Sequence, residues 1–112
     1  MTESVLKVRD WSLTQRRALT PTEIVKRLAD HPGWRLSGDG DEVAIEKSFG
    51  FFDYHETISF VNALAFVANA LDHHPDLSVH YDRCVVRLRT HSLSAISEAD
   101  FEYAGRVDAL LA

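Results

Sequence analysis

The stretch DYHETISFVNALAFVANALDHHP, residues 53–75, predicts the central helix of the fold and the corner that follows it. Asp53 followed by Glu56 has the spacing of a helix N-cap and its acidic partner. Apolar residues then recur at helical spacing as far as Leu71. Because a proline biases the preceding residue away from helical geometry, we expect His73 and His74 to lie at the end of this helix. The predicted apolar set is Ile58, Phe60, Val61, Leu64, Ala65, Phe66, Val67, Ala68 and Leu71.

Shorter elements precede this helix. The capping-box sequence at residues 20–23 predicts an amphipathic helix that ends at residues 31–33. Residues 34–36 resemble a strand that enters a glycine turn, and residues 43–51 alternate between apolar and polar side chains, with Lys47 as the exception. These two strands predict a half-buried antiparallel hairpin.

Two more strands and a last helix follow the corner. Residues 77–81 and 84–89 alternate on either side of a tight turn, which again predicts antiparallel strands. Ser97, with Asp100 three residues later, has the spacing of a second capping box and starts the last helix. The apolar side of that helix is predicted to consist of Phe101, Ala104, Val107, Leu110 and Leu111.

This order of elements predicts the fold class. Because each apolar face needs a partner layer, we expect a two-layer α+β domain: a four-stranded, mostly antiparallel sheet with three helices on one face. We place this single domain at residues 20–112 and an N-terminal arm at residues 1–19, which could hold a short strand or be a loose arm. Exposed sheet edges favour a strand-edge dimer.

Composition limits the classes of function. The chain has 112 residues and a formal net charge of -5, with a pI near 5.6, which argues against a direct nucleic-acid surface. The single Cys84 suits a reducing compartment. The N-terminus lacks the features of a secretory signal, and no segment approaches the roughly 20 apolar residues of a membrane span. We therefore expect a soluble, cytoplasmic protein without a membrane partner.

The histidines of the corner are the candidates for chemistry. His73 and His74 are followed by Thr90-His91, and imidazole can serve as proton donor or acceptor near neutral pH. Ordinary surface histidines are one alternative. A zinc site that includes Asp72 is another, but adjacent residues rarely both reach one ion, and the usual ligand spacing is absent. We therefore predict no metal.

A longer pattern connects these residues. His73-His74-Pro75, Tyr81, Thr90-His91 and Asp100 resemble the signature of the pterin-4a-carbinolamine dehydratase family, which is also known through its dimerisation-cofactor members. The similarity is dense over residues 69–100 and extends over roughly residues 20–111. One departure is Asn69, where many members carry Glu. Asn can form a hydrogen bond but cannot hold a negative charge.

The resemblance implies a hydro-lyase that removes water from a 4a-hydroxytetrahydropterin to give the quinonoid dihydropterin, without a cofactor. It assigns proton transfer to His73 and His91, and catalysis or pterin binding to His74. Asp100 is expected to orient His91 or to cap the last helix, and Asn69 to support the site. The expected substrate contacts are Asp72, Arg89, Thr90, Ser92 and Trp34.

The resemblance also implies partners. We expect a small pterin substrate, a homodimer or homotetramer, and a role in recycling the pterin of an aromatic amino-acid hydroxylase. The alternative is a non-catalytic interaction or assembly module of the same fold, because members of the family also act as partners of a transcription factor and in the assembly of larger enzymes.

Overall fold

The structure is a computed structural model that describes residues 7–11 and 17–112. Its order of elements confirms the predicted order, with two short 3-10 turns in addition. The helices are α1 (Pro21–Ala29), α2 (Tyr54–Leu71) and α3 (Glu98–Leu110); the strands are β1 (Arg35–Ser37), β2 (Ala44–Gly50), β3 (Asp76–Val79) and β4 (Arg83–Leu88); the 3-10 turns are η2 (Gly40–Glu42) and η3 (His91–Leu93). Within the described ranges, no helix is long and apolar enough to cross a bilayer.

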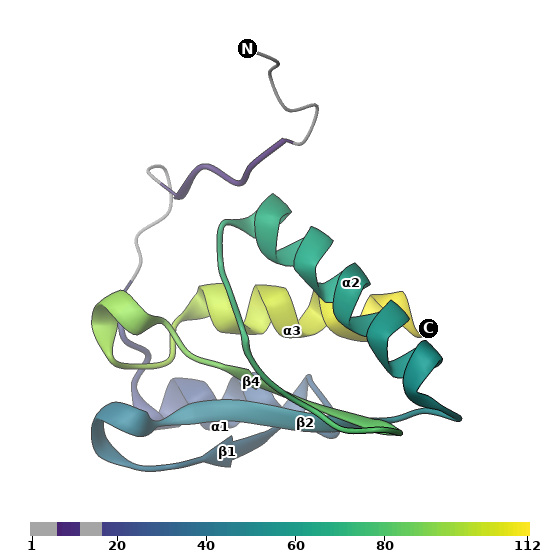
Figure 1. Cartoon of the computed structure of the whole chain (residues 1–112). Helices are drawn as coiled ribbons and strands as arrows, with labels where there is room; N and C mark the ends of the chain where they lie inside the picture. Colours follow the sequence, from purple (N-terminus) through teal and green to yellow (C-terminus); the bar gives the residue numbers. More distant parts are fainter. Residues whose placement is uncertain (1–6, 12–16) are drawn as a thin grey trace.

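The four strands form one sheet in the order β1-β2-β4-β3, and every neighbouring pair is antiparallel. In the register, Ile45 lies opposite Leu88 and Leu77 lies opposite Val86. The predicted two-layer α+β class is therefore confirmed. Because β3 directly follows α2 and pairs with β4, the end of α2 and the end of β4 lie on the same side of the domain (Figure 1).

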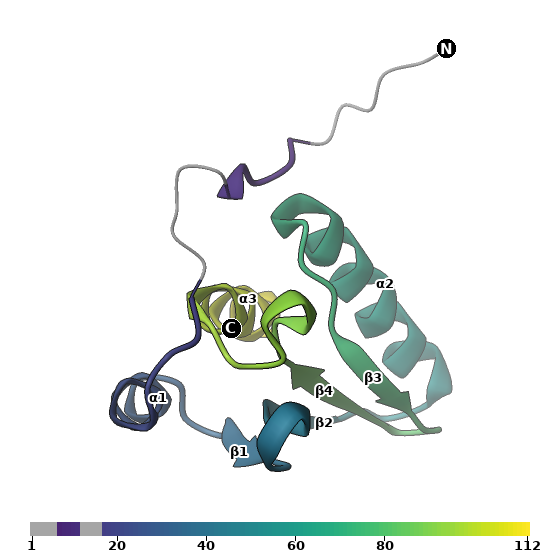
Figure 2. The ribbon, with the colours of Figure 1, turned by 90° about the vertical axis from the view of Figure 1, so that its left-hand side faces the viewer.

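Helices α2 and α3 lie across one face of the sheet, and α1 lies beside the first turns of α3 (Figures 1 and 2). An ion pair between Arg27 and Glu98 joins α1 to α3. The buried core fills the space between the helices and the sheet, and its fully buried large side chains include Ile45, Leu64, Leu71, Val86, Leu88 and Tyr103.

The buried stripe of α2 is narrower than the predicted apolar set. The buried side chains are Thr57, Phe60, Leu64, Val67, Ala68 and Leu71. Ala65 and Phe66 are exposed, and so are Leu110 and Leu111 at the end of α3, so the prediction was wrong at these positions. A helix that rests on a sheet and one neighbouring helix buries one side, and its remaining apolar residues stay uncovered.

The two predicted capping boxes are present. Thr20 and Glu23 satisfy each other's backbone amides at the start of α1, and Ser97 and Asp100 do the same at the start of α3. Lys47, the exception to the alternation of β2, reaches over Phe49 and donates from its Nζ to a carboxylate oxygen of Asp108 at 2.9 Å. Its charge is therefore paired, and its stem covers apolar surface.

Candidate active site

The corner at the end of α2 separates the two adjacent histidines. Asp72 adopts the left-handed conformation with φ 48°, and the His73 amide donates to the Ala68 carbonyl at 3.1 Å. This is the hydrogen bond of a Schellman motif, formed here on an aspartate rather than the usual glycine. The turn leaves His73 buried and His74 exposed. The sequence correctly placed both histidines at the helix end, and the backbone turn gives them different environments.

His73 forms a buried pair with Asp100. Its Nε2 lies 2.6 Å from Oδ1 of Asp100, and the side chains are 6% and 0% exposed. The second oxygen of Asp100 accepts from the Thr90 hydroxyl at 3.0 Å and from the Ser97 amide at 2.9 Å. A carboxylate that accepts three hydrogen bonds is fixed in place and can orient the imidazole.

A hydroxyl chain supports this carboxylate. Thr90 Oγ1 lies 2.6 Å from Ser97 Oγ, which in turn accepts from the Ala99 amide at 3.3 Å. Because the Thr90 hydroxyl donates to Asp100, the Ser97 hydroxyl is the donor to Thr90. All of these groups are buried, so the network joins the end of β4 to the start of α3 without contact with water.

Tyr103 packs behind His73. The two ring centroids are 6.3 Å apart, and the phenol donates to the Leu64 carbonyl at 2.7 Å. Burial raises the pKa of the Tyr103 hydroxyl, so it stays a neutral donor at physiological pH. Tyr103 therefore packs against the His73 ring as a neutral side chain and is not a candidate proton donor to a substrate.

His91 lies on the other side of the site, at the start of η3. Its Nε2 is 3.8 Å from Oδ2 of Asp76, and both side chains are more than half exposed. Asp76 is the first residue of β3 and follows His74-Pro75 directly. The site thus contains two histidine–carboxylate pairs, one buried and one open to solvent.

The histidines of the two pairs line one small cavity. Its volume is about 170 Å³, and the residues that line it are Asp72, His73, His74, Thr90, His91 and Ser92. All six were predicted site residues. They come from two chain segments, the turn after α2 and the segment after β4, which the antiparallel pairing of β3 with β4 brings together.

Three predicted site residues lie elsewhere. Trp34 is buried in the core and donates its indole N–H to Asp108 at 3.0 Å, so it does not close the cavity. Arg89 turns toward η2, where it donates to the Asp41 carbonyl and to the Glu42 carboxylate. Asn69 is exposed on the last turn of α2 and does not line the cavity.

The role expected for Asp100 is corrected in part. It caps α3, as predicted, but the histidine that it contacts is His73 rather than His91. Sequence reasoning missed Asp76 and Ser97 as neighbours of the site. Asp76 follows the His-His-Pro motif directly, and this proximity was the available signal; the contact between Ser97 and Thr90 depends on the path of the loop between them.

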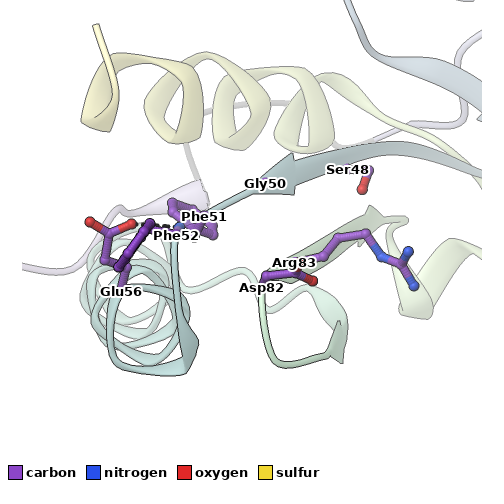
Figure 3. A pocket seen from close by; sticks show the side chains of 7 residues that line it. All are labelled: Ser48, Gly50, Phe51, Phe52, Glu56, Asp82 and Arg83. Carbon is purple, nitrogen blue, oxygen red and sulfur yellow. Dashed lines mark hydrogen bonds between the residues drawn. The ribbon is translucent and has the colours of Figure 1, made fainter.

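A larger hollow lies at the opposite end of the sheet, about 570 Å³ in volume (Figure 3). It lies beside the end of β2 and the start of β4, and no histidine lines it. Two carboxylates line it, Glu56 and Asp82. Glu56 accepts a hydrogen bond from the Phe52 amide at 2.8 Å, at the start of α2. Because three histidines line the smaller cavity and none lines this hollow, the smaller cavity is the better candidate for proton transfer near neutral pH.

The described side chains do not form a metal-binding cluster. Across residues 7–11 and 17–112, no group of three or more histidine, cysteine, aspartate or glutamate side chains lies close enough together to hold a metal ion. Cys84 is fully buried in the core, and burial raises the pKa of its thiol, which makes it a poor ligand or nucleophile.

The fold and the site together define a two-layer α+β protein with a histidine-lined cavity between a helix end and a strand end. The chain belongs to the pterin 4 alpha carbinolamine dehydratase family, whose model matches residues 17–110. A relative from Paracidovorax citrulli, named as an inferred pterin-4-alpha-carbinolamine dehydratase, is 69% identical over 97% of this chain and 94% of its own. A relative with the same name from Bdellovibrio bacteriovorus is 50% identical over 84% of this chain and 78% of its own.

Two solved structures share the fold. A transcriptional coactivator/pterin dehydratase from Brucella melitensis is 35% identical, with a TM-score of 0.78 over 86% of this chain and 100% of its own. A pterin dehydratase-like protein identified as a RuBisCO assembly factor in the alpha-carboxysome is 31% identical, with a TM-score of 0.59 over 71% of this chain and 90% of its own. The fold is therefore found in proteins that are described with different roles.

Proposed function

We propose that this protein is a 4a-hydroxytetrahydrobiopterin dehydratase that returns the pterin product of an aromatic amino-acid hydroxylase to the quinonoid dihydropterin. The single observation that supports this most is the pair of histidines, His73 and His91, each beside a carboxylate, at one cavity of a chain in this family. We place the reaction in the cytoplasm, where a lone buried thiol such as that of Cys84 stays reduced.

The reaction requires two proton transfers and no oxidation. The C4a–O bond and the N5–H bond break, and a C4a=N5 double bond forms. One histidine protonates the departing hydroxyl, which leaves as water, and the other accepts the N5 proton. In this proposal the protein needs one imidazole in each protonation state, and each positioned group contributes about 100- to 10,000-fold.

The carboxylates determine how well each histidine can carry a proton. Asp100 holds the His73 ring in one orientation and stabilises the imidazolium that forms when His73 accepts a proton. His91 is exposed and can exchange protons with water between turnovers. His74 and the loop residues Thr90 to Ser92 are left to contact the pterin edge.

The test is a direct assay of water loss from synthetic 4a-hydroxytetrahydrobiopterin. We expect the parent protein to exceed the uncatalysed rate and His73→Ala to lose at least about 100-fold. His80→Gln, which replaces an exposed histidine in the loop after β3, is the matched control and should retain parental turnover. A parent protein no faster than the buffer would refute the enzymatic proposal.

A non-catalytic assembly role is the second candidate. The similarity to a protein identified as a RuBisCO assembly factor favours it, as does Asn69 in place of a charged residue. The uncovered apolar side chains Phe66 and Val79, on α2 and on the edge strand β3, support a homodimer or homotetramer in either case. Light scattering of the purified chain would measure the oligomeric state, and an inactive but oligomeric protein would favour the assembly role.

A further inference from the structure

The last four carbonyls of α2 receive their hydrogen bonds from two different sources. A helix end normally leaves these acceptors without partners inside the helix. The carbonyls of Ala68 and Asn69 accept from the turn that leads into His73. The carbonyl of Ala70 accepts from the Arg9 amide at 2.7 Å, and that of Leu71 accepts from the Trp11 indole N–H at 2.6 Å. The N-terminal segment therefore completes the capping of the helix that carries the histidines.

The same segment reaches the second helix of the site. The Arg9 guanidinium lies 3.4 Å from the Glu102 carboxylate on α3 and 4.7 Å from the centre of the Trp11 ring. Glu102 is two residues beyond Asp100. Residues 9–11 thus join the end of α2 to the start of α3, and the His73–Asp100 hydrogen bond joins the same two places. The segment lies close to the end of α2 in both views (Figures 1 and 2).

We propose that Arg9 and Trp11 form a brace that positions His73 for proton transfer, with the Trp11 indole N–H as its main contact. The inference rests on the proposed dehydratase function. Its physical basis is the peptide group between Leu71 and Asp72. The Leu71 carbonyl accepts the hydrogen bond from Trp11, and the next residue, Asp72, is in the left-handed conformation. A non-glycine residue in that conformation is held there by its surroundings. Loss of the brace therefore loosens the turn that directs His73 toward Asp100.

Neither brace residue lines the cavity, so both are positioning residues rather than catalytic ones. Two variants separate their contributions. Trp11→Phe keeps an aromatic ring beneath Arg9 and removes only the donor to the Leu71 carbonyl. Arg9→Ala removes the link to α3 and keeps the indole N–H. Arg35→Ala is the matched control, because it removes an arginine–glutamate pair, Arg35 with Glu46, on the far face of the sheet.

The experiment measures kcat, KM and backbone amide exchange on the full chain. With Trp11→Phe we expect kcat to fall about 3- to 10-fold, which corresponds to the loss of one hydrogen bond, while KM stays at the parental value. The control Arg35→Ala should keep parental turnover. The His73 amide should exchange several-fold faster, while amides of β2 and β4 remain as protected as in the parent. Arg9→Ala should change kcat and the exchange rate of the His73 amide in the same directions by a smaller factor. It tests the proposal if Trp11→Phe fails to fold.

Three outcomes would overturn the brace. The first is an unchanged exchange rate of the His73 amide in Trp11→Phe. The second is an unchanged kcat in Trp11→Phe when the parent is active. The third is faster exchange throughout β2 and β4, which would mean general destabilisation. An inactive parent would refute the proposed function, but the exchange of the His73 amide would still decide whether the brace exists. The two proposals therefore fail in different ways.

Discussion

The two histidine–carboxylate pairs at the cavity differ in burial: one is almost fully buried, and the other is more than half exposed. His73 and Asp100 are buried, lie 2.6 Å apart and belong to a network that includes Thr90 and Ser97. His91 and Asp76 are more than half exposed and lie 3.8 Å apart. A histidine and an aspartate thus form part of a buried hydrogen-bond network in the first pair and an exposed surface pair in the second.

Because of this difference in burial, the two pairs should contribute differently to the stability of the fold. A buried charge that loses its partner costs several kcal/mol, whereas an exposed pair contributes about 0–1 kcal/mol. We therefore expect changes at the buried pair to affect both folding and turnover, and changes at the exposed pair to affect turnover alone.

The largest effect is expected from Asp100→Asn. The amide nitrogen of Asn would face one or more of the donors that now surround the carboxylate, which should cost at least about 2 kcal/mol and lower Tm by about 8–16 °C. Turnover should fall by about 100-fold or more, because His73 loses its orienting group. Thermal melts and the dehydration assay test both effects.

The control for this variant is Asp108→Asn on the same helix. Asp108 accepts from Trp34 and Lys47, outside the cavity, so its loss should lower Tm without lowering kcat. If Asp100→Asn melted at the parental temperature, the description of the buried network as a stabilising unit would be wrong.

His91→Gln should give the second-largest effect, and it should be confined to activity. We expect turnover to fall about 100-fold or more, and Tm to stay within about 3 °C of the parent, because an exposed side chain is being replaced. A bell-shaped pH profile of kcat/KM in the parent should lose one limb in this variant. The limb that disappears identifies His91 as the acid or the base; two intact limbs would remove His91 from proton transfer.

Asp76→Asn should have a smaller effect. Because the two groups are exposed and 3.8 Å apart, their interaction is weak, so turnover should fall by less than about 5-fold. The loss should shrink further at high salt, because salt screens exposed charges. A 100-fold loss would mean that Asp76 contacts the substrate and that the exposed pair resembles the buried one.

The smallest effect is expected at an ion pair outside the cavity, Arg17 with Glu23. The hydrogen bond from Arg17, together with those from Thr20 at the helix cap, lowers the pKa of Glu23 from 4.5 to about 2. The stabilisation is therefore present above pH 4.5 and is lost as the pH falls from 4.5 toward 2. With Arg17→Ala, the Glu23 carboxyl should titrate closer to its ordinary value by NMR, and Tm near neutral pH should change little because the pair is exposed. An unchanged titration would assign the shift to the helix cap alone.

The sequence predicted the elements well because each was signalled by local rules. Capping boxes at residues 20–23 and 97–100 marked two helix starts, and alternation marked β2 and β4. The apolar faces were predicted less well, since Phe66 and Leu110 belong to apolar sets that no neighbouring element covers. Whether an apolar side chain is buried depends on the layer that packs against it, and that layer comes from distant sequence.

The site divides in the same way. The motifs His73-His74-Pro75 and Thr90-His91 contain most of the residues that line the cavity, and the family resemblance pointed to them. Only the tertiary structure decided that His73 pairs with Asp100, 27 positions away, and that Trp34 belongs to the core. Partners so far apart in the chain are chosen by the packing of α2 against α3 and the sheet, which no local pattern encodes.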